Sequence, residues 1–215
     1  MVESAPVRPQ GLLAIFVDVP GDLQRDFDDW YDSDHPPVRG RLPGFLSAVR
    51  YRAVQGEPNN MALYELASLD ALQTPEYLEL RRSPDPSPWA HVRSGWKGHT
   101  RIIYRLRNVQ GAMRSDRLDA PYLAAVRLFV RPGGEDEVRE WLDGEHAVRQ
   151  LTVPGARFYH GHESVEGPSH FLTLWGLEDP AVFASAQWEA VRDTPWRKRV
   201  SPLMERTVRG IYKRI

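Results

Sequence analysis

The chain contains one sequence pattern twice, and this repeat restricts the folds open to it. Residues 30–35 read WYDSDH, residues 141–146 read WLDGEH, and Pro43-Gly44 returns at the same offset as Pro154-Gly155. Further matches join residues 62–66 to 172–177, 88–89 to 195–196 and 101–105 to 209–213. A period of about half the chain is too long for a solenoid repeat. The pattern indicates two similar domains fused head to tail. In one chain, these two halves can pair with each other as the two subunits of a symmetric dimer do.

Composition excludes several classes of function. The 215 residues include seven Trp and 41% hydrophobic residues, enough for a core in each half of about 105 residues. A net charge of −1 gives no electrostatic case for nucleic acid or an anionic membrane as partner. The absence of Cys excludes disulfides, thiol nucleophiles and Cys-ligated metals. No apolar run is long enough to span a bilayer, and residues 1–10 lack the apolar stretch of a signal peptide, so we expect a cytoplasmic protein.

Hydrophobic patterns predict the same six elements in each half. In the first half they predict strands at 12–17, 45–54, 61–67 and 100–106, with helices that begin near Asp22 and at Ser68 or Asp70. In the second half they predict strands at 122–130, 156–162, 170–177 and 208–214, with helices at 135–151 and from Asp179 onward. This β-α-β-β-α-β order is that of the ferredoxin-like unit.

The predicted fold class is therefore α+β, with two tandem ferredoxin-like units. The first unit spans residues 1–108, a linker with several charges spans 109–121, and the second unit spans 122–215. One such unit has helices on one face of its sheet and leaves the other face bare. We expect the two sheets to stack face to face within the chain, forming an intrachain α/β barrel of the dimeric type. Because each half covers the other, we expect a monomer or a homodimer.

The repeated motif also resembles a known family. The pattern of residues 30–35, followed by Pro43, Gly44 and Phe45 and by the strand at 63–66, resembles the dimeric α/β-barrel superfamily, closest to its EthD-like branch and related tandem proteins. The resemblance covers the whole chain, twice. Members include cofactor-free cyclases and dehydratases, lactone isomerases, small monooxygenases, haem enzymes and proteins with no known activity. In many of them a pocket lies between the sheet and its helices, so the resemblance implies such a pocket here.

His35 is the first candidate for catalysis. It follows Tyr31 by one helical turn and shares its apolar face, where an imidazole can act as general acid or base. Asp32 is close enough on a helix to orient the ring or raise its pKa. The alternative is a structural histidine that bonds a backbone carbonyl freed by Pro36 and Pro37. Those prolines should break or kink the helix and open space beside it, so we prefer the first half as the working pocket.

His146 is the second candidate, since it occupies the matching place in the second half with Asp143 and Glu145 beside it. Ala147 and Val148 replace the two prolines, so this helix is expected to continue unbroken. A structural role is again the alternative, because two halves rarely keep one catalytic role.

Four further residues are predicted to bind a substrate. Trp30 and Tyr31 lie on the helix of His35, Tyr64 lies on a strand, and Arg127 interrupts an apolar strand where it could hold a carboxylate. For Arg127, a salt bridge to an acid of the other half is the favoured alternative.

The remaining histidines give weak signals. His160 and His162 share one face of a strand, yet no carboxylate stands at ligand spacing, so we predict no metal site. His91 after Trp89 could ligate haem, but a single histidine is poor evidence, so we predict no cofactor.

These features predict a small cofactor-independent enzyme of the dehydratase, lyase or isomerase type, which moves a proton on an apolar or aromatic small molecule. One alternative is a non-catalytic ligand-binding or stress-related protein in which both histidines are structural. A second is an oxygenase, either haem-dependent or cofactor-free. The expected partner is a small hydrophobic or aromatic substrate, without nucleic acid or membrane.

Overall fold

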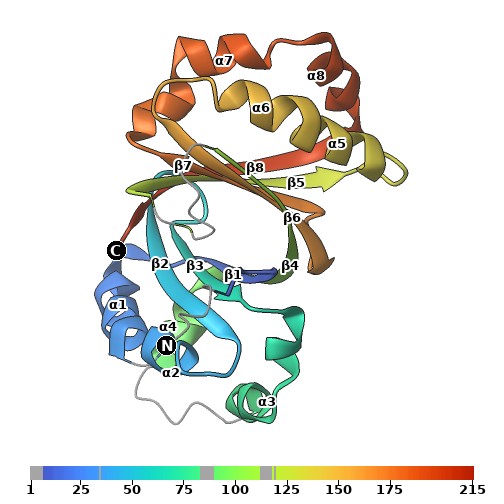
Figure 1. Ribbon diagram of the computed structural model, residues 1–215. Helices are drawn as coiled ribbons and strands as arrows, with labels where there is room; N and C mark the ends of the chain where they lie inside the picture. The colour runs from blue at the N-terminus through green and yellow to red at the C-terminus, as the bar shows by residue number, and fades with distance from the viewer. Residues whose placement is uncertain (1–6, 34, 83–89, 112–117, 119) are drawn as a thin grey trace, which may run out of the picture.

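Each half of the chain folds into a four-stranded antiparallel sheet with helices on one face (Figure 1). The computed structural model describes residues 7–33, 35–82, 90–111, 118 and 120–215. The first half contains β1 (Gly11–Asp18), α1 (Gln24–Ser33), α2 (His35–Arg39), β2 (Phe45–Gly56), β3 (Asn60–Leu66), α3 (Pro75–Arg82), α4 (Ala90–Gly95) and β4 (Lys97–Gly111). The second contains β5 (Tyr122–Val130), α5 (Glu135–Trp141), α6 (Ala147–Gln150), β6 (Ala156–Glu166), β7 (Phe171–Leu177), α7 (Ala186–Arg192), α8 (Pro195–Val200) and β8 (Met204–Arg214).

The eight strands close into one barrel, in the order β1-β3-β2-β8-β5-β7-β6-β4. The two sheets meet where β2 pairs with β8 and where β4 pairs with β6, for example at Tyr51 opposite Arg214 and at Leu106 opposite His162. The predicted α+β fold and intrachain barrel are confirmed. The two sheets face each other across one core, as expected, and in addition their edges pair, which closes the barrel. This pairing satisfies the backbone groups that β2, β4, β6 and β8 would otherwise leave open.

A hydrophobic core fills the barrel. It includes the buried rings of Phe16, Tyr51, Tyr104, Phe158 and Tyr212. Leu118 and Ala120 belong to the same core, and the Tyr51 hydroxyl donates a 3.2 Å hydrogen bond to the carbonyl oxygen of Leu118. These two residues lie in the stretch predicted as a linker, so part of that stretch packs inside the barrel. The predicted linker also differs from the structure at its start, because β4 extends to Gly111 and its last residues pair with β6.

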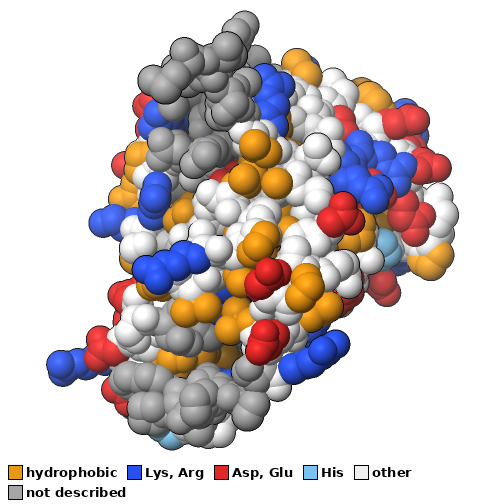
Figure 2. All heavy atoms as spheres, turned by 60° about the horizontal axis from the view of Figure 1, so that its bottom comes forward, with side chains coloured by type: hydrophobic (Ala, Val, Ile, Leu, Met, Phe, Trp, Pro, Cys, Tyr) orange, Lys and Arg blue, Asp and Glu red, His pale blue; other side chains and the backbone are white. Residues whose placement is uncertain are grey.

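The helices pack on the outer faces of the barrel, one set for each half (Figure 1). On α1, Phe27, Trp30 and Tyr31 follow helical spacing and are buried against the sheet. On the opposite side, Trp141 and Leu142 join one core cluster and Trp188 joins another. Figure 2 shows the outer face of the first half, where hydrophobic, acidic and basic side chains are interspersed. None of the helices in the described ranges is long and apolar enough to cross a membrane.

The two halves differ at the repeated motif. In the first half, helical residues lie on both sides of residue 34, in α1 up to Ser33 and in α2 from His35 to Arg39, and α2 contains both Pro36 and Pro37. In the second half, the helix continues as expected, but it widens into a π-helical segment, η3 (Leu142–His146), between α5 and α6. Single π-helical turns are rare and often occur at functional sites.

We expect Gly56→Ala to destabilise the protein by about 2 kcal/mol, because Gly56 lies in the seam between β2 and β8. Its φ is +83°, and a Cβ atom there would lie 2.3 Å from the carbonyl oxygen of Arg209. Denaturant unfolding would measure the change. Gly21→Ala is the matched control, since a Cβ there meets nothing within 4 Å. Equal effects of the two substitutions would contradict this account of the seam.

Candidate functional site

A pocket lies between the sheet and the helices of each half. The second-half pocket has an empty volume of about 420 Å³, part of it open to solvent, and its walls include Trp141, His146, Trp175 and Trp188. The first-half pocket has an empty volume of about 560 Å³, also partly open, and its walls include Tyr31, Tyr64, Tyr77 and Trp96. Each pocket is also lined by three arginines, and none of the described lining residues of either pocket is acidic.

The π-helical segment places His146 in the wall of the second-half pocket. Its ring stacks on Trp141 at 4.4 Å between centroids and meets Trp175 edge-on at 5.3 Å. No hydrogen bond joins either ring nitrogen to a described residue. The two indoles therefore hold the plane of the imidazole, while its nitrogens are available to a ligand.

The charges that shift the pKa of His146 are all positive. Burial, together with the guanidinium groups of Arg192, Arg197 and Arg209, lowers the pKa of His146 to about 3. Burial and mutual repulsion also lower the pKa of Arg197 and Arg209. Glu189 offsets part of this charge by pairing with Arg192 at 2.8 Å, but its own side chain is 61% exposed. The pocket therefore presents a neutral imidazole in a positive field, which favours an anionic ligand.

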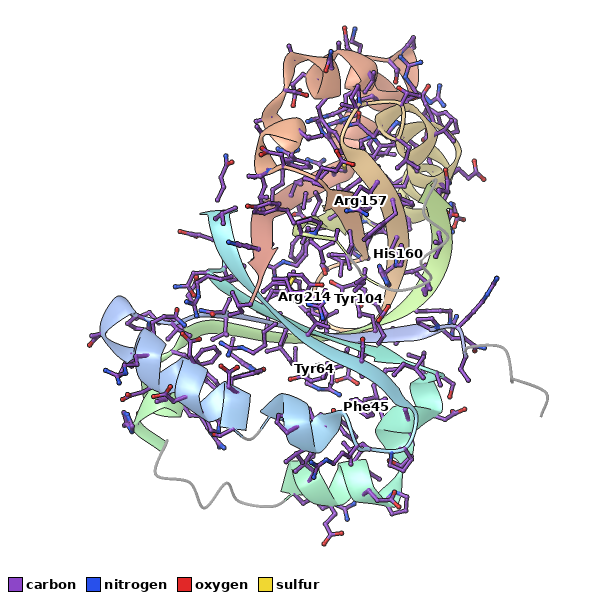
Figure 3. All side chains as sticks on the ribbon, turned by 60° about the vertical axis from the view of Figure 1, so that its left-hand side comes forward. Phe45, Tyr64, Tyr104, Arg157, His160 and Arg214 are labelled. Carbon is purple, nitrogen blue, oxygen red and sulfur yellow. The ribbon has the colours of Figure 1, made fainter. Side chains whose placement is uncertain are left out.

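The first-half pocket has the same general chemistry with different side chains. The hydroxyl of Tyr64 donates to that of Tyr31 at 3.4 Å, and burial raises the pKa of both, so both stay protonated. Arg101 donates to the Tyr77 hydroxyl at 3.2 Å and pairs with Glu166 at 2.6 Å. Figure 3 shows Tyr64 and Phe45 on the helix side of the first-half sheet, whereas Tyr104 and His160 lie on the barrel side.

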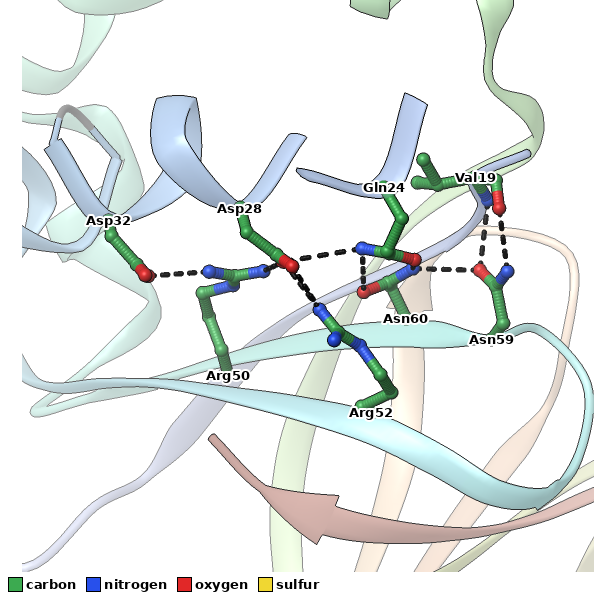
Figure 4. Close-up of polar contacts among 8 residues, drawn as sticks. All are labelled: Val19, Gln24, Asp28, Asp32, Arg50, Arg52, Asn59 and Asn60. Atoms are coloured by element: carbon green, nitrogen blue, oxygen red, sulfur yellow. Dashed lines mark hydrogen bonds and ion pairs between the residues drawn. The ribbon is translucent and has the colours of Figure 1, made fainter. Parts of the chain in front are cut away.

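Asp32 forms an ion pair that the sequence did not reveal. Its carboxylate accepts a 2.5 Å hydrogen bond from Arg50, whose side chain is 6% exposed and also bonds Asp28 (Figure 4). Arg52 binds Asp28 as well, so two arginines of β2 hold α1 against the sheet. The side chain of His35 lies outside the described residues, and its contact with Asp32 stays a prediction.

The two acids beside His146 are also engaged elsewhere. Asp143 pairs with Arg107 and accepts a 3.2 Å hydrogen bond from the Tyr159 hydroxyl. Glu145 accepts a 2.6 Å hydrogen bond from the Thr194 hydroxyl. These contacts connect η3 to strands and to α8, and they fix the position of the segment.

Of the predicted substrate-binding residues, Tyr31 and Tyr64 line the first-half pocket, whereas Trp30 and Arg127 line neither pocket. Trp30 is 1% exposed within the core under α1. Arg127 points into the barrel, where its guanidinium lies 4.2 Å from the ring centroid of Phe16. No ion pair joins it to a described carboxylate, so the expected salt bridge between the halves is replaced by a cation–π contact, which still connects β5 to β1.

The other histidines lie away from both pockets, except His99. His160 and His162 are buried in the barrel with ring centroids 6.2 Å apart. Among the described residues, no group of three or more His, Asp or Glu side chains could hold a metal ion. His91 lies on the exposed side of α4 with its Nε2 atom 2.9 Å from Asp26. That position does not fit the axial ligand of a haem, because the ring nitrogen is engaged at the surface.

Sequence reasoning missed the arginines, although the repeat contains a signal for them. Arg81 and Arg192 each follow the aromatic residue of the second helix by four positions, Tyr77 in one half and Trp188 in the other. Arg101 and Arg209 are the matching first residues of the repeated segments 101–105 and 209–213 in the last strand of each half. Each of these arginines stands at the same place in both halves, as the histidines do.

Comparison with protein-family models and with curated proteins gave no match. Solved structures do match across nearly the whole chain. An anthrone oxidase-like protein has a TM-score of 0.72 at 16% identity, covering 97% of this chain and 92% of its own. A chlorite dismutase from Candidatus Nitrospira defluvii, solved as a mutant, has a TM-score of 0.61 at 11% identity, with coverages of 96% and 92%. A putative monooxygenase from Lactobacillus acidophilus has 0.56 at 8% identity, with 95% and 94%. The chain therefore has the fold of the dimeric α/β-barrel proteins, with the whole barrel built from one polypeptide.

Proposed function

We propose that the protein is a small enzyme that removes a proton from an aromatic or enolisable small molecule in the second-half pocket. His146 accepts the proton, and Arg192, Arg197 and Arg209 bind the oxyanion that forms. The observation that supports this most is a neutral imidazole, without a protein hydrogen bond among the described residues, inside a pocket with three arginines. The electron pair of the broken bond stays on the substrate, so charge is separated only within the pocket.

The low pKa of His146 in the empty pocket is compatible with this role. The same arginines that oppose a proton on the imidazole also favour negative charge on the substrate. An oxyanion that forms about 4 Å from the imidazole attracts its positive charge by about 4 kcal/mol at an effective dielectric constant of about 20. This attraction offsets the repulsion between the arginines and the protonated imidazole. That corresponds to roughly three pKa units, which returns the imidazole to its ordinary range.

Two outcomes can follow the proton transfer. In a lyase or isomerase, the oxyanion eliminates a group or is reprotonated elsewhere. In a cofactor-free oxygenase, it reacts with molecular oxygen, and the structural similarity to an anthrone oxidase-like protein favours this second candidate. In the first half, His35 with Asp32 is the corresponding proposal, because His35 occupies the matching place in the repeat.

Anthrone is a suitable probe, because loss of a ring CH₂ proton turns its carbonyl oxygen into an oxyanion. Deuterium exchange at this carbon, followed by NMR without oxygen, measures the proton transfer alone. Formation of the quinone in air measures oxygenation. Exchange without oxidation would favour the lyase or isomerase type. Binding with neither reaction would favour the non-catalytic alternative, and absence of both binding and exchange would contradict the proposal for this class of substrate.

Arg209→Met is expected to lower kcat/KM for the exchange by about tenfold to a hundredfold, because a charged donor to the oxyanion is lost. Arg206→Met is the matched control on the same strand, since Arg206 lies outside the pocket lining, over the ring of Phe129. If the two variants lose activity equally, the effect comes from general charge or stability rather than from oxyanion binding.

A further inference from the structure

The first-half pocket has properties that the proposed chemistry of the second half does not use. Its floor is apolar, made by Leu13 and Ile15 of β1, and its sides are the rings of Tyr31, Tyr64 and Tyr77. The three tyrosines are each less than 4% exposed, so they are fixed in place by packing. A flat apolar group fits between such walls, because aromatic side chains offer large, rigid contact surfaces.

Arg39, Arg81 and Arg101 make the pocket positive. None of the described lining residues is acidic, and Tyr31 and Tyr64 stay protonated because burial raises their pKa. Burial and Arg101 lower the pKa of His99, so this residue adds little charge at neutral pH. The guanidinium of Arg39 lies 5.8 Å from the ring centroid of Tyr64. The positive groups thus adjoin the aromatic walls.

Among the described residues, one carboxylate outside the pocket lining contacts these arginines. Glu166 of β6 pairs with Arg101 at 2.6 Å, and its side chain is 61% exposed. Arg101 also donates to the Tyr77 hydroxyl through its other terminal nitrogen. Glu166 therefore holds Arg101 at the rim and competes with any anion that enters, while no ion pair joins Arg39 or Arg81 to a described carboxylate.

The arginine pair is the feature that both halves share. Arg81 and Arg101 match Arg192 and Arg209 in the repeat, and each pair faces the pocket of its own half. The described linings also contain one histidine each, at positions that do not match in the repeat: His146 is held between two indoles, and His99 of β4 stacks on Trp96 at 5.2 Å. The shared arginine pair therefore indicates a shared ligand class.

We propose that the first-half pocket is a separate binding site for a small aromatic carboxylate. The ring lies against Tyr31, Tyr64 and Tyr77, and the carboxylate is bound by Arg81 and Arg101, whose planar guanidinium groups suit bidentate contact. Together with the second-half pocket, this gives the chain two sites for planar anions. The inference stands whether or not the second half is an enzyme.

Calorimetric titration with 2-naphthoate tests this site in a chain that carries Arg192→Met and Arg209→Met, so that the second pocket is weakened. We expect one molecule to bind per chain. Adding Arg81→Met is expected to weaken binding at least tenfold, and Arg105→Met is the control, since Arg105 is exposed on the same strand as Arg101 and outside the lining. Circular dichroism and thermal unfolding would first show that every variant is folded.

Two further measurements separate anion recognition from apolar binding. The neutral analogue 2-naphthylmethanol is expected to bind at least tenfold more weakly than 2-naphthoate. Glu166→Gln is expected to strengthen 2-naphthoate binding several-fold, because the competing carboxylate is removed. The proposal is overturned if the acid and the alcohol bind equally, if Arg81→Met and Arg105→Met have the same effect, or if the double variant of the second pocket abolishes all binding.

Discussion

Replacing His146 by Ala is expected to lower turnover of anthrone by about a hundredfold or more, the usual scale for a positioned proton acceptor. The ring is held between Trp141 and Trp175, so Ala removes the acceptor while the arginines remain. The rate of deuterium exchange without oxygen measures this step directly. Because the pKa of His146 in the empty pocket is about 3, kcat/KM should also show no histidine ionisation between about pH 5 and 8.

His91→Ala is the control for this experiment, because His91 is exposed and lines neither pocket. His35→Ala is the parallel test of the first half. Full activity in His35→Ala with loss in His146→Ala assigns the chemistry to the second half, and the reverse assigns it to the first. If both variants keep full activity, the paired histidines are structural and the proposed mechanism is wrong.

Acidification is expected to destabilise the protein by several kcal/mol between about pH 6.5 and pH 3, in part through His162. Burial and the neighbouring His160 lower the pKa of His162 to about 3, whereas in the unfolded chain it has its ordinary value of about 6.5. The folded state therefore binds fewer protons than the unfolded state in this range. The stabilisation is fully present above about pH 6.5 and is lost as the pH falls towards 3.

His162→Gln removes this titration and keeps a polar side chain in the barrel. Its free energy of unfolding, measured by denaturant titration from pH 7 to pH 4, should decrease less steeply than that of the wild type. His91→Gln is the control for a histidine replaced at the surface, since its side chain is 51% exposed. Parallel curves for wild type and His162→Gln would show that His162 does not cause the acid sensitivity.

Much of the fold could be predicted because its signals are local. The apolar residues of β5 gave both ends of that strand correctly, and the spacing of Phe27, Trp30 and Tyr31 gave the buried face of α1. The repeat then predicted that the second half would have the same order of elements, which the structure shows. Closure into one barrel was predicted, but the pairing of β2 with β8 and of β4 with β6 was not, because backbone pairing between distant edges leaves no pattern in either strand.

The sequence by itself determined the elements, the α+β class and the presence of paired aromatic and histidine positions, since each depends on neighbours within one or two turns of chain. Only the tertiary structure shows which side chains meet in the two pockets. The π-helical turn directs His146 into a pocket, and arginines from α7, α8 and β8 converge on it. Asp32 binds Arg50 of a neighbouring strand. Charge interactions depend on distance in space and on exclusion of water, and antiparallel strands bring together residues that lie far apart along the chain.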